Sequence, residues 1–211
     1  MRLTVVRRLA AALLLTVLAS APVAHATDGT TAARTAPVRA RIIFDKDARH
    51  PFASRVLWRA WQRQPDGTWD LIDHAGWRAG SGFGGPDTTH ECVKGRGWLP
   101  DGRYSFVQYD DYAGDLIKGR TFFLGSKRCR NGTLRTELFI HTETGAHNRQ
   151  CANRPGDQIC RWEWPKVNDY RSGGCIKMAP GDLLALTRHY HRWFDPRVRY
   201  ARARVQVVVH P

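Results

Sequence analysis

Two residues in the second half of the chain could together activate a nucleophile. Cys175 stands behind two glycines in "DYRSGGCIKMAPGDL", residues 169 to 183, and His141 ends the apolar run "ELFIH" 34 positions earlier. A thiol becomes a strong nucleophile when a nearby base accepts its proton, and histidine is the base whose pKa suits neutral pH. The pair therefore predicts acyl transfer, with Cys175 as nucleophile and His141 as general base.

The glycines before Cys175 predict open access to its sulfur. Gly173 and Gly174 allow backbone angles and close approach that other residues do not, so we expect main-chain N–H groups here to face a substrate oxygen. A helical pattern follows at once, and the positive end of that helix is expected to lower the pKa of Cys175 from about 8.5. His147, six residues after His141, is the competing base.

The cysteine count points to one free thiol. Five cysteines are present, and an odd number in an exported protein leaves one without a partner. Cys151 and Cys160 bracket the short polar loop "CANRPGDQIC", which a disulfide closes easily. If they pair, Cys92 and Cys129 can pair across a central hairpin, and Cys175 remains free. Other pairings stay open at this point.

The N-terminus has the layout of an exported protein. Three arginines, the apolar run 9–18 and the small-residue site at 24–26 form the pattern of a signal peptide over residues 1–26. An uncleaved anchor is the alternative, although the apolar run is short for a bilayer. Residues 27–38 are small and polar and indicate a disordered leader, and one domain is expected over 39–211. We expect a secreted or extracytoplasmic, wall-associated monomer without stable membrane insertion.

The domain is predicted to be mainly β. Short segments rich in β-branched and aromatic residues are separated by turn signals such as Asn131-Gly132, which suits a hairpin. One helix is predicted over 179–194, because Pro180 suits a first turn and the apolar residues there recur at helical spacing. The expected strand segments are "RARIIF", "SRVLWRAWQR", "TWDLI", "GRYSFVQY", "GRTFFLG", "RTELFIHT" and "RARVQVVVHP".

The formal net charge of +14 favours anionic partners such as an acidic cell wall. Two alternatives to a cysteine acyltransferase remain: a basic wall-binding module without activity, and a secreted nuclease that uses His141 and His147. The nuclease does not explain the glycines beside the free cysteine, so no nucleic acid is expected as a partner. No paired ligand spacing predicts a zinc site, and the order of histidine before cysteine is the reverse of papain-like proteases.

The segments "IHTETG", "SGGCIKM" and "PGDLLAL" together resemble the L,D-transpeptidase catalytic domain (YkuD-like). The resemblance implies a mainly β fold, a β-sandwich or barrel with one helix after the cysteine. It assigns Cys175 as nucleophile, His141 as base, and Ser172, Gly173 and Gly174 as the turn before the nucleophile. Gly173 stands where the family has a second histidine, and the spacing from histidine to cysteine is about twice the usual length.

The resemblance implies that Cys175 forms a thioester with peptidoglycan stem peptides. It also implies that the reaction needs no metal or cofactor. A main-chain carbonyl, that of Thr142 or Gly174, is expected to orient His141. The additional residues between the histidine motif and the cysteine motif include Trp162 and Trp164. We interpret this segment as a lid over the substrate. Substrate contacts are also expected from Ser172, Gly173, Thr142, Lys177 and Arg171.

Overall fold

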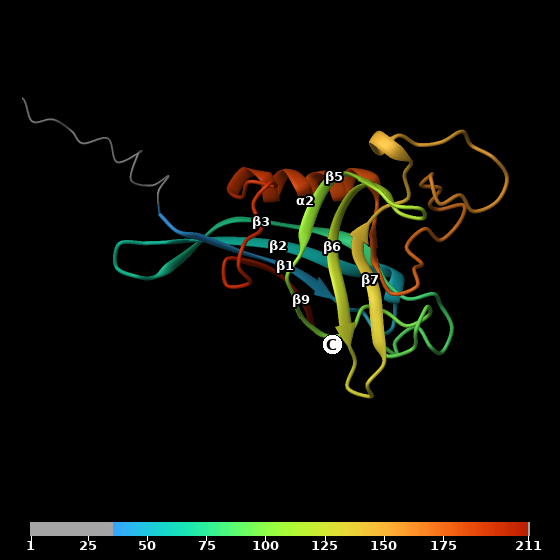
Figure 1. Cartoon of the computed structure of the whole chain (residues 1–211), viewed down its shortest axis with the longest axis horizontal. Helices are drawn as coiled ribbons and strands as arrows, with labels where there is room; N and C mark the ends of the chain where they lie inside the picture. Colours follow the sequence, from blue (N-terminus) through green and yellow to red (C-terminus); the bar gives the residue numbers. More distant parts are fainter. Residues whose placement is uncertain (1–35, 211) are drawn as a thin grey trace, which may run out of the picture. The chain divides into compact units, whose positions relative to one another are not determined.

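The computed structural model describes residues 36–210 of the 211-residue chain (Figure 1). The prediction of a mainly β protein is confirmed. The strands are β1 (Val38–Asp45), β2 (Ser54–Arg63), β3 (Trp69–Gly80), β4 (Gly102–Tyr104), β5 (Val107–Ala113), β6 (Lys118–Arg128), β7 (Leu134–His141), β8 (Ile176–Met178) and β9 (Val205–His210). The helices are α2 (Pro180–Trp193) and two short 3-10 turns, η1 (Pro51–Ala53) and η2 (Ala146–Asn148).

The expected signal peptide, residues 1–26, lies outside the described residues, as does most of the expected leader. The last residue of that leader, Val38, already belongs to β1, so the domain begins one residue earlier than predicted. No helix within residues 36–210 is long and apolar enough to cross a membrane.

All nine strands belong to one mixed sheet, in the order β4-β9-β1-β2-β3-β8-β7-β6-β5. The β1–β9 and β7–β8 pairs are parallel and the other neighbours are antiparallel. Both halves of this sheet bury side chains in the same cluster, which includes Ile42 and Phe44 of β1 with Phe122 of β6 and Ile140 of β7. The two halves of this mixed sheet therefore share one core.

Alternation along the strands explains which face is buried. In β1, Val38, Ala40, Ile42 and Phe44 are buried, while the intervening residues are half-buried or exposed. Side chains of a strand point to opposite faces in turn, so this pattern places every second residue of β1 in the core. The predicted hairpin at Asn131-Gly132 is also present, joining β6 to β7, and Gly132 has the positive φ of 88° that such a turn requires.

Helix α2 forms as the sequence predicts and covers one region of the core. Pro180 opens it and Asp182 lies in its first turn. Its buried side chains include Leu183, Leu186 and Tyr190. The Tyr190 ring packs edge-on against Phe122 at 5.7 Å between centroids, so the helix is held on the sheet by aromatic contacts as well as by leucines.

A buried carboxylate fastens α2 to β3 on the other side of the core. The side chain of Asp73 accepts hydrogen bonds from the indole N–H groups of Trp58 (3.0 Å) and Trp193 (2.9 Å), and lies 2.9 Å from His189 Nδ1. Burial acts to raise the pKa of Asp73, but the hydrogen bonds from His189, Trp193 and Trp58 hold it below its ordinary value. The charged form is therefore the one that the fold stabilises.

Replacing this carboxylate is expected to destabilise the fold. Asp73→Ala leaves two buried indole N–H groups without acceptors and should lower the free energy of unfolding by about 3 kcal/mol in urea denaturation. Because the folded pKa is depressed, the contribution of Asp73 is complete above about pH 4 and is lost as the pH falls through the folded pKa. Asp70→Ala, an exposed carboxylate of the same strand, is the control and should change little; equal losses in both variants would contradict this assignment.

Candidate active site around Cys175

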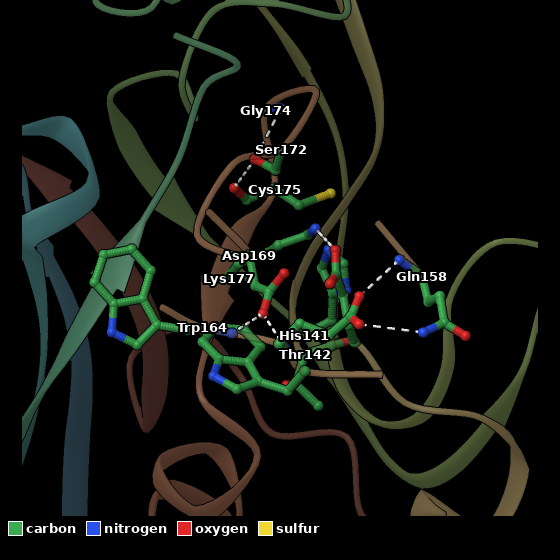
Figure 2. Close-up of polar contacts among 12 residues, drawn as sticks. His141, Thr142, Gln158, Trp164, Asp169, Ser172, Gly174, Cys175 and Lys177 are labelled. Carbon is green, nitrogen blue, oxygen red and sulfur yellow. Dashed lines mark hydrogen bonds and ion pairs between the residues drawn. The ribbon is translucent and has the colours of Figure 1, made fainter. Parts of the chain in front are cut away.

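The parallel pairing of β7 with β8 places His141 on the strand next to the one that Cys175 precedes, and Figure 2 shows both residues. Ile140 pairs with Ile176, and His141 with Lys177. Ile140 and Ile176 are fully buried in the core, so the alternation of a strand directs His141 and Lys177 to the opposite face. Cys175 directly precedes β8, and within residues 36–210 no hydrogen bond joins its thiol to His141.

A main-chain carbonyl orients the His141 ring. His141 Nδ1 lies 3.0 Å from the Thr142 carbonyl oxygen and donates to it, which leaves Nε2 as the ring atom that can accept a proton. Of the two carbonyls expected for this role, Thr142 is the one that performs it. Burial, reinforced by the charge of Lys177, lowers the pKa of His141 to about 3. The imidazole is therefore neutral at pH 7, as a general base must be.

The Cys175 thiol is also neutral at rest. Burial raises its pKa to about 11, although the Phe139 N–H and the charges of Lys177 and Arg135 act in the opposite direction. The expected lowering by a helix terminus is wrong, because α2 begins only at Pro180 and β8 lies between. The thiol of Cys175 and the imidazole of His141 are therefore both uncharged at neutral pH.

Strand β7 is distorted opposite the thiol. Between Arg135 and Leu138 it contains one residue more than the facing part of β6, which is a β-bulge, and Glu137 there has a φ of 52°. The Cys175 Sγ donates to the Glu137 carbonyl at 3.5 Å. Bulges commonly re-aim backbone groups beside active sites, and this one directs a carbonyl oxygen at the sulfur.

The turn before Cys175 is closed by a serine. Ser172 Oγ donates to the Cys175 carbonyl at 2.5 Å and accepts the Gly174 N–H at 3.2 Å, as Figure 2 shows. Two expectations are corrected by these bonds. The Ser172 hydroxyl is used within the turn and not on a substrate, and the Gly174 N–H expected to face the substrate oxygen is directed at Ser172.

A buried arginine supports this turn from behind. Arg135 donates from Nη1 to the carbonyls of Glu91 and Trp98, and from Nη2 to those of Gly97 (3.0 Å) and Gly173 (2.9 Å). All four acceptors are main-chain carbonyls, so its charge is solvated by dipoles and not cancelled by a carboxylate. Sequence reasoning missed Arg135, because in the alternating segment "LRTELFIH" it looks like an ordinary surface charge.

Arg135 also explains why one of the two glycines must be a glycine. A Cβ on Gly174 would lie 1.9 Å from Arg135 Nη2, and Gly174 has a φ of 125° that other residues rarely adopt. A Cβ on Gly173 would meet its nearest neighbour, the Gly95 carbonyl oxygen, only at 3.4 Å, and Gly173 does not have a positive φ. The position where the sequence departs from the family pattern therefore has room for a side chain.

Lys177 is occupied by a partner of its own. Its ammonium pairs with Glu143 Oε1, so the expected contact of Lys177 with a substrate carboxylate is not what this structure provides. Burial raises the pKa of Glu143 to about 7, against the opposing effect of Lys177. Thr142, another expected substrate contact, has a buried hydroxyl without a hydrogen-bond partner and acts through its carbonyl. Arg171 is exposed, 6.0 Å from the Phe52 ring.

The segment between β7 and β8 folds over itself through aromatic contacts. Trp162 and Trp164 both meet the ring of Tyr170 edge-on, at 5.0 and 5.4 Å between centroids. Arg78 of β3 lies 4.3 Å from the Trp164 ring. Trp164 nevertheless keeps 39% of its surface exposed, so part of this indole remains available to a ligand.

One of the two expected disulfides is present. Cys151 and Cys160 are bonded, with 5.6 Å between their Cα atoms, and Cys175 is free as predicted. The expected Cys92–Cys129 bond is not formed: both are free thiols, although their sulfurs and a Glu91 oxygen lie within 4.8 Å of one another. Burial, with Cys92 as the next cause, raises the pKa of Cys129 to about 12, which keeps that thiol protonated.

The second candidate base is directed elsewhere. His147, on η2, is exposed, and its Nδ1 pairs with the Asp111 carboxylate at 2.6 Å. The neighbouring Asn148 accepts the Arg120 N–H at 2.7 Å, which fixes it on β6. Within residues 36–210, no hydrogen bond or ring contact joins His147 to His141, so the two histidines of the nuclease alternative are not assembled into one site.

Comparisons of the chain with models of protein families, with curated proteins and with solved structures find no match in any of the three.

The two glycines before Cys175 should respond differently to the same substitution. Gly174→Ala forces a clash with Arg135 at a positive φ and should lower the free energy of unfolding by about 3 kcal/mol. Gly173→Ala is the matched control and should stay within about 1 kcal/mol of wild type. Urea denaturation measures both, and a tolerated Gly174→Ala would disprove the close approach of Arg135.

The raised pKa of Cys175 predicts how its alkylation depends on pH. The thiolate fraction of a thiol with a pKa of about 11 should grow roughly tenfold per unit between pH 7 and about 9 without a plateau. Iodoacetamide labelling, followed by mass spectrometry of the peptide containing Cys175, separates this thiol from Cys92 and Cys129. A rate that already levels off near neutral pH would indicate a preformed thiolate–imidazolium pair and refute the neutral resting state.

Proposed function

We propose that this protein is a cysteine acyltransferase of the L,D-transpeptidase type that acts on peptidoglycan stem peptides. The observation that carries the proposal is the β7–β8 pairing. It puts a neutral His141, oriented by the Thr142 carbonyl, on the strand next to β8, which the free thiol of Cys175 directly precedes. The resemblance of "IHTETG" and "SGGCIKM" to that family supplies the substrate class.

In the first step of the proposed reaction, Cys175 Sγ attacks the carbonyl carbon of the third residue of a stem peptide. The thiol proton passes to His141 Nε2, the ring atom left free by the Nδ1 hydrogen bond. The C–N bond to the terminal D-alanine then breaks, and its nitrogen takes the proton from the imidazolium. A thioester on Cys175 and free D-alanine are the products of this half-reaction.

In the second step an amine of a neighbouring stem, or water, attacks the thioester carbon. His141 accepts a proton from that nucleophile and returns it to the departing sulfur, which restores the resting thiol. The amine gives a new amide cross-link and water gives a shortened stem. No cofactor takes part in either step.

Two fixed positive charges favour the anionic sulfur during the reaction. The charges of Lys177 and Arg135 both act to lower the pKa of Cys175, although burial outweighs them at rest. Arg135 is held by four carbonyls and needs no rearrangement as negative charge develops. In this proposal Arg135 is a positioning residue, since it acts through the Gly173 carbonyl and its charge.

The fold and the loop fit the same function. In the proposal the curved sheet with α2 after the nucleophile is the β-sandwich of the L,D-transpeptidase type. The segment between β7 and β8 acts as a lid, with the exposed part of Trp164 facing the bound stem. Gly173, exposed beside Cys175, leaves room for the substrate at the mouth of the site.

The basic surface suits an anionic cell wall. A surface depression over β1, β4 and the segment before β9 is lined by four arginines: Arg39, Arg41, Arg103 and Arg202. Within residues 36–210, none of these arginines forms an ion pair with a carboxylate. Unpaired guanidinium groups bind phosphate and carboxylate groups well. We propose that this arginine face holds the secreted, monomeric enzyme on the wall.

The proposed reaction can be tested with a disaccharide-tetrapeptide as substrate. Intact mass spectrometry should show an acyl adduct on the wild type, with release of D-alanine. Cys175→Ala should abolish both, whereas Cys92→Ala, which removes another free thiol, should retain them. An adduct that persists in Cys175→Ala, or its absence from folded wild type, would refute the proposal.

The two histidines provide a second matched pair. His141→Ala should slow acylation by about 10²–10⁴-fold, the usual contribution of a general base, while His147→Ala should leave the rate unchanged. Nuclease activity that survives Cys175→Ala but disappears in His141→Ala would instead support the nuclease alternative.

A further inference from the structure

Three carboxyl groups lie close together in the segment between β7 and β8. Glu143 follows β7, Asp157 lies inside the disulfide-closed loop and Asp169 precedes the turn of the nucleophile. One side-chain oxygen from each lies within 4.8 Å of the other two. Residues from three separate parts of the chain thus place negative groups around one point.

Two of these carboxylates have buried oxygens that no donor reaches. Glu143 is 4% exposed and Asp169 is 1% exposed, yet Glu143 Oε2 and Asp169 Oδ1 have no hydrogen-bond partner. Their other oxygens are satisfied: Glu143 Oε1 pairs with Lys177, and Asp169 Oδ2 accepts main-chain N–H groups, that of Trp164 at 2.6 Å. Figure 2 shows Asp169 with these bonds. Burying a carboxylate oxygen without a hydrogen-bond donor costs free energy. The two unpartnered oxygens therefore indicate that a positively charged partner is missing.

The charges show what kind of partner is missing. Three carboxyl groups here share one cationic side chain, that of Lys177, which is a charge imbalance that a divalent cation would remove. Such an ion would also supply a positive partner for the two unpartnered oxygens.

We propose that Glu143, Asp157 and Asp169 bind a calcium ion. The three protein ligands are all carboxylate oxygens. Hard cations prefer such ligands, whereas zinc and copper do not depend on them. Calcium accepts six to eight ligands in irregular geometry, whereas magnesium demands a near-ideal octahedron. Asp157 is exposed, so water can complete the coordination on that side. The site is independent of the acyltransferase proposal.

Calcium at this point would tie the loop to the sheet. Asp157 belongs to the segment closed by Cys151–Cys160, and Asp169 already holds the main chain at Glu163 and Trp164. Glu143 stands two residues beyond the end of β7. The ion therefore fixes the loop that contains Trp162 and Trp164 against the strand that ends in His141, and folding of this loop becomes dependent on calcium.

Terbium luminescence tests the site directly, because Tb³⁺ replaces Ca²⁺ and is sensitised by nearby tryptophan. The purified chain should show saturable Tb³⁺ emission on excitation of tryptophan, and added Ca²⁺ should displace it. Asp157→Asn, which removes an exposed ligand without touching the buried pair, should weaken Tb³⁺ binding by about tenfold or more. Asp115→Asn, an exposed carboxylate in the β5–β6 turn, should bind Tb³⁺ as wild type does.

A thermal measurement supplies the second readout. Saturating Ca²⁺ should raise the unfolding temperature of wild type and of Asp115→Asn, and raise it less in Asp157→Asn. Absence of saturable emission would overturn the proposal and indicate that a proton shared by Glu143 and Asp169 removes the charge imbalance. Equal weakening of Tb³⁺ binding in Asp157→Asn and Asp115→Asn would also overturn the proposal, because it would indicate that Tb³⁺ adsorbs to surface carboxylates. Acyl-adduct formation is not part of either readout, so failure of the enzyme proposal would leave this result unchanged.

Discussion

The three-residue strand β8 is the constraint on which the site depends. It pairs with β3 on one side and with β7 on the other, and so joins the two halves of the sheet into one. Lys177 faces Gly80 across one edge and His141 across the other. A Cβ on Gly80 would lie 2.6 Å from atoms of Tyr170, so a glycine at this position lets Tyr170 pack closely on the end of β3. Without β8, Cys175 would have no fixed position relative to the histidine.

Burial at this junction sets the protonation states of the site. It raises the pKa of Cys175 and lowers that of His141, so neither group carries a charge at neutral pH. Arg135 and Lys177 lie beside them and are paired with main-chain carbonyls and with Glu143. The raised pKa of Cys175 keeps its thiol slow to react with oxidants and alkylating reagents at neutral pH.

Much of the scaffold could be predicted, because strand alternation, turn residues and helix periodicity are local properties. The β6–β7 hairpin, α2 and the short-range Cys151–Cys160 bond are of this kind. Strand β8 was not predicted, since three residues are too few to show a period, and Cys175 was therefore placed at a helix terminus. The roles of Ser172, Gly174 and Lys177 were misjudged because each is taken up by a partner distant in sequence or within the turn.

The sequence by itself indicated the candidate pair Cys175 and His141, a free thiol at Cys175, the main strands and the helix, because these follow from residue type and local spacing. Only the tertiary structure decided what surrounds the pair. It placed Arg135 behind the turn, left Cys92 and Cys129 unbonded, and gathered Glu143, Asp157 and Asp169 around one point. The physical reason is that burial, charge balance and hydrogen-bond satisfaction depend on which distant segments the sheet brings into contact.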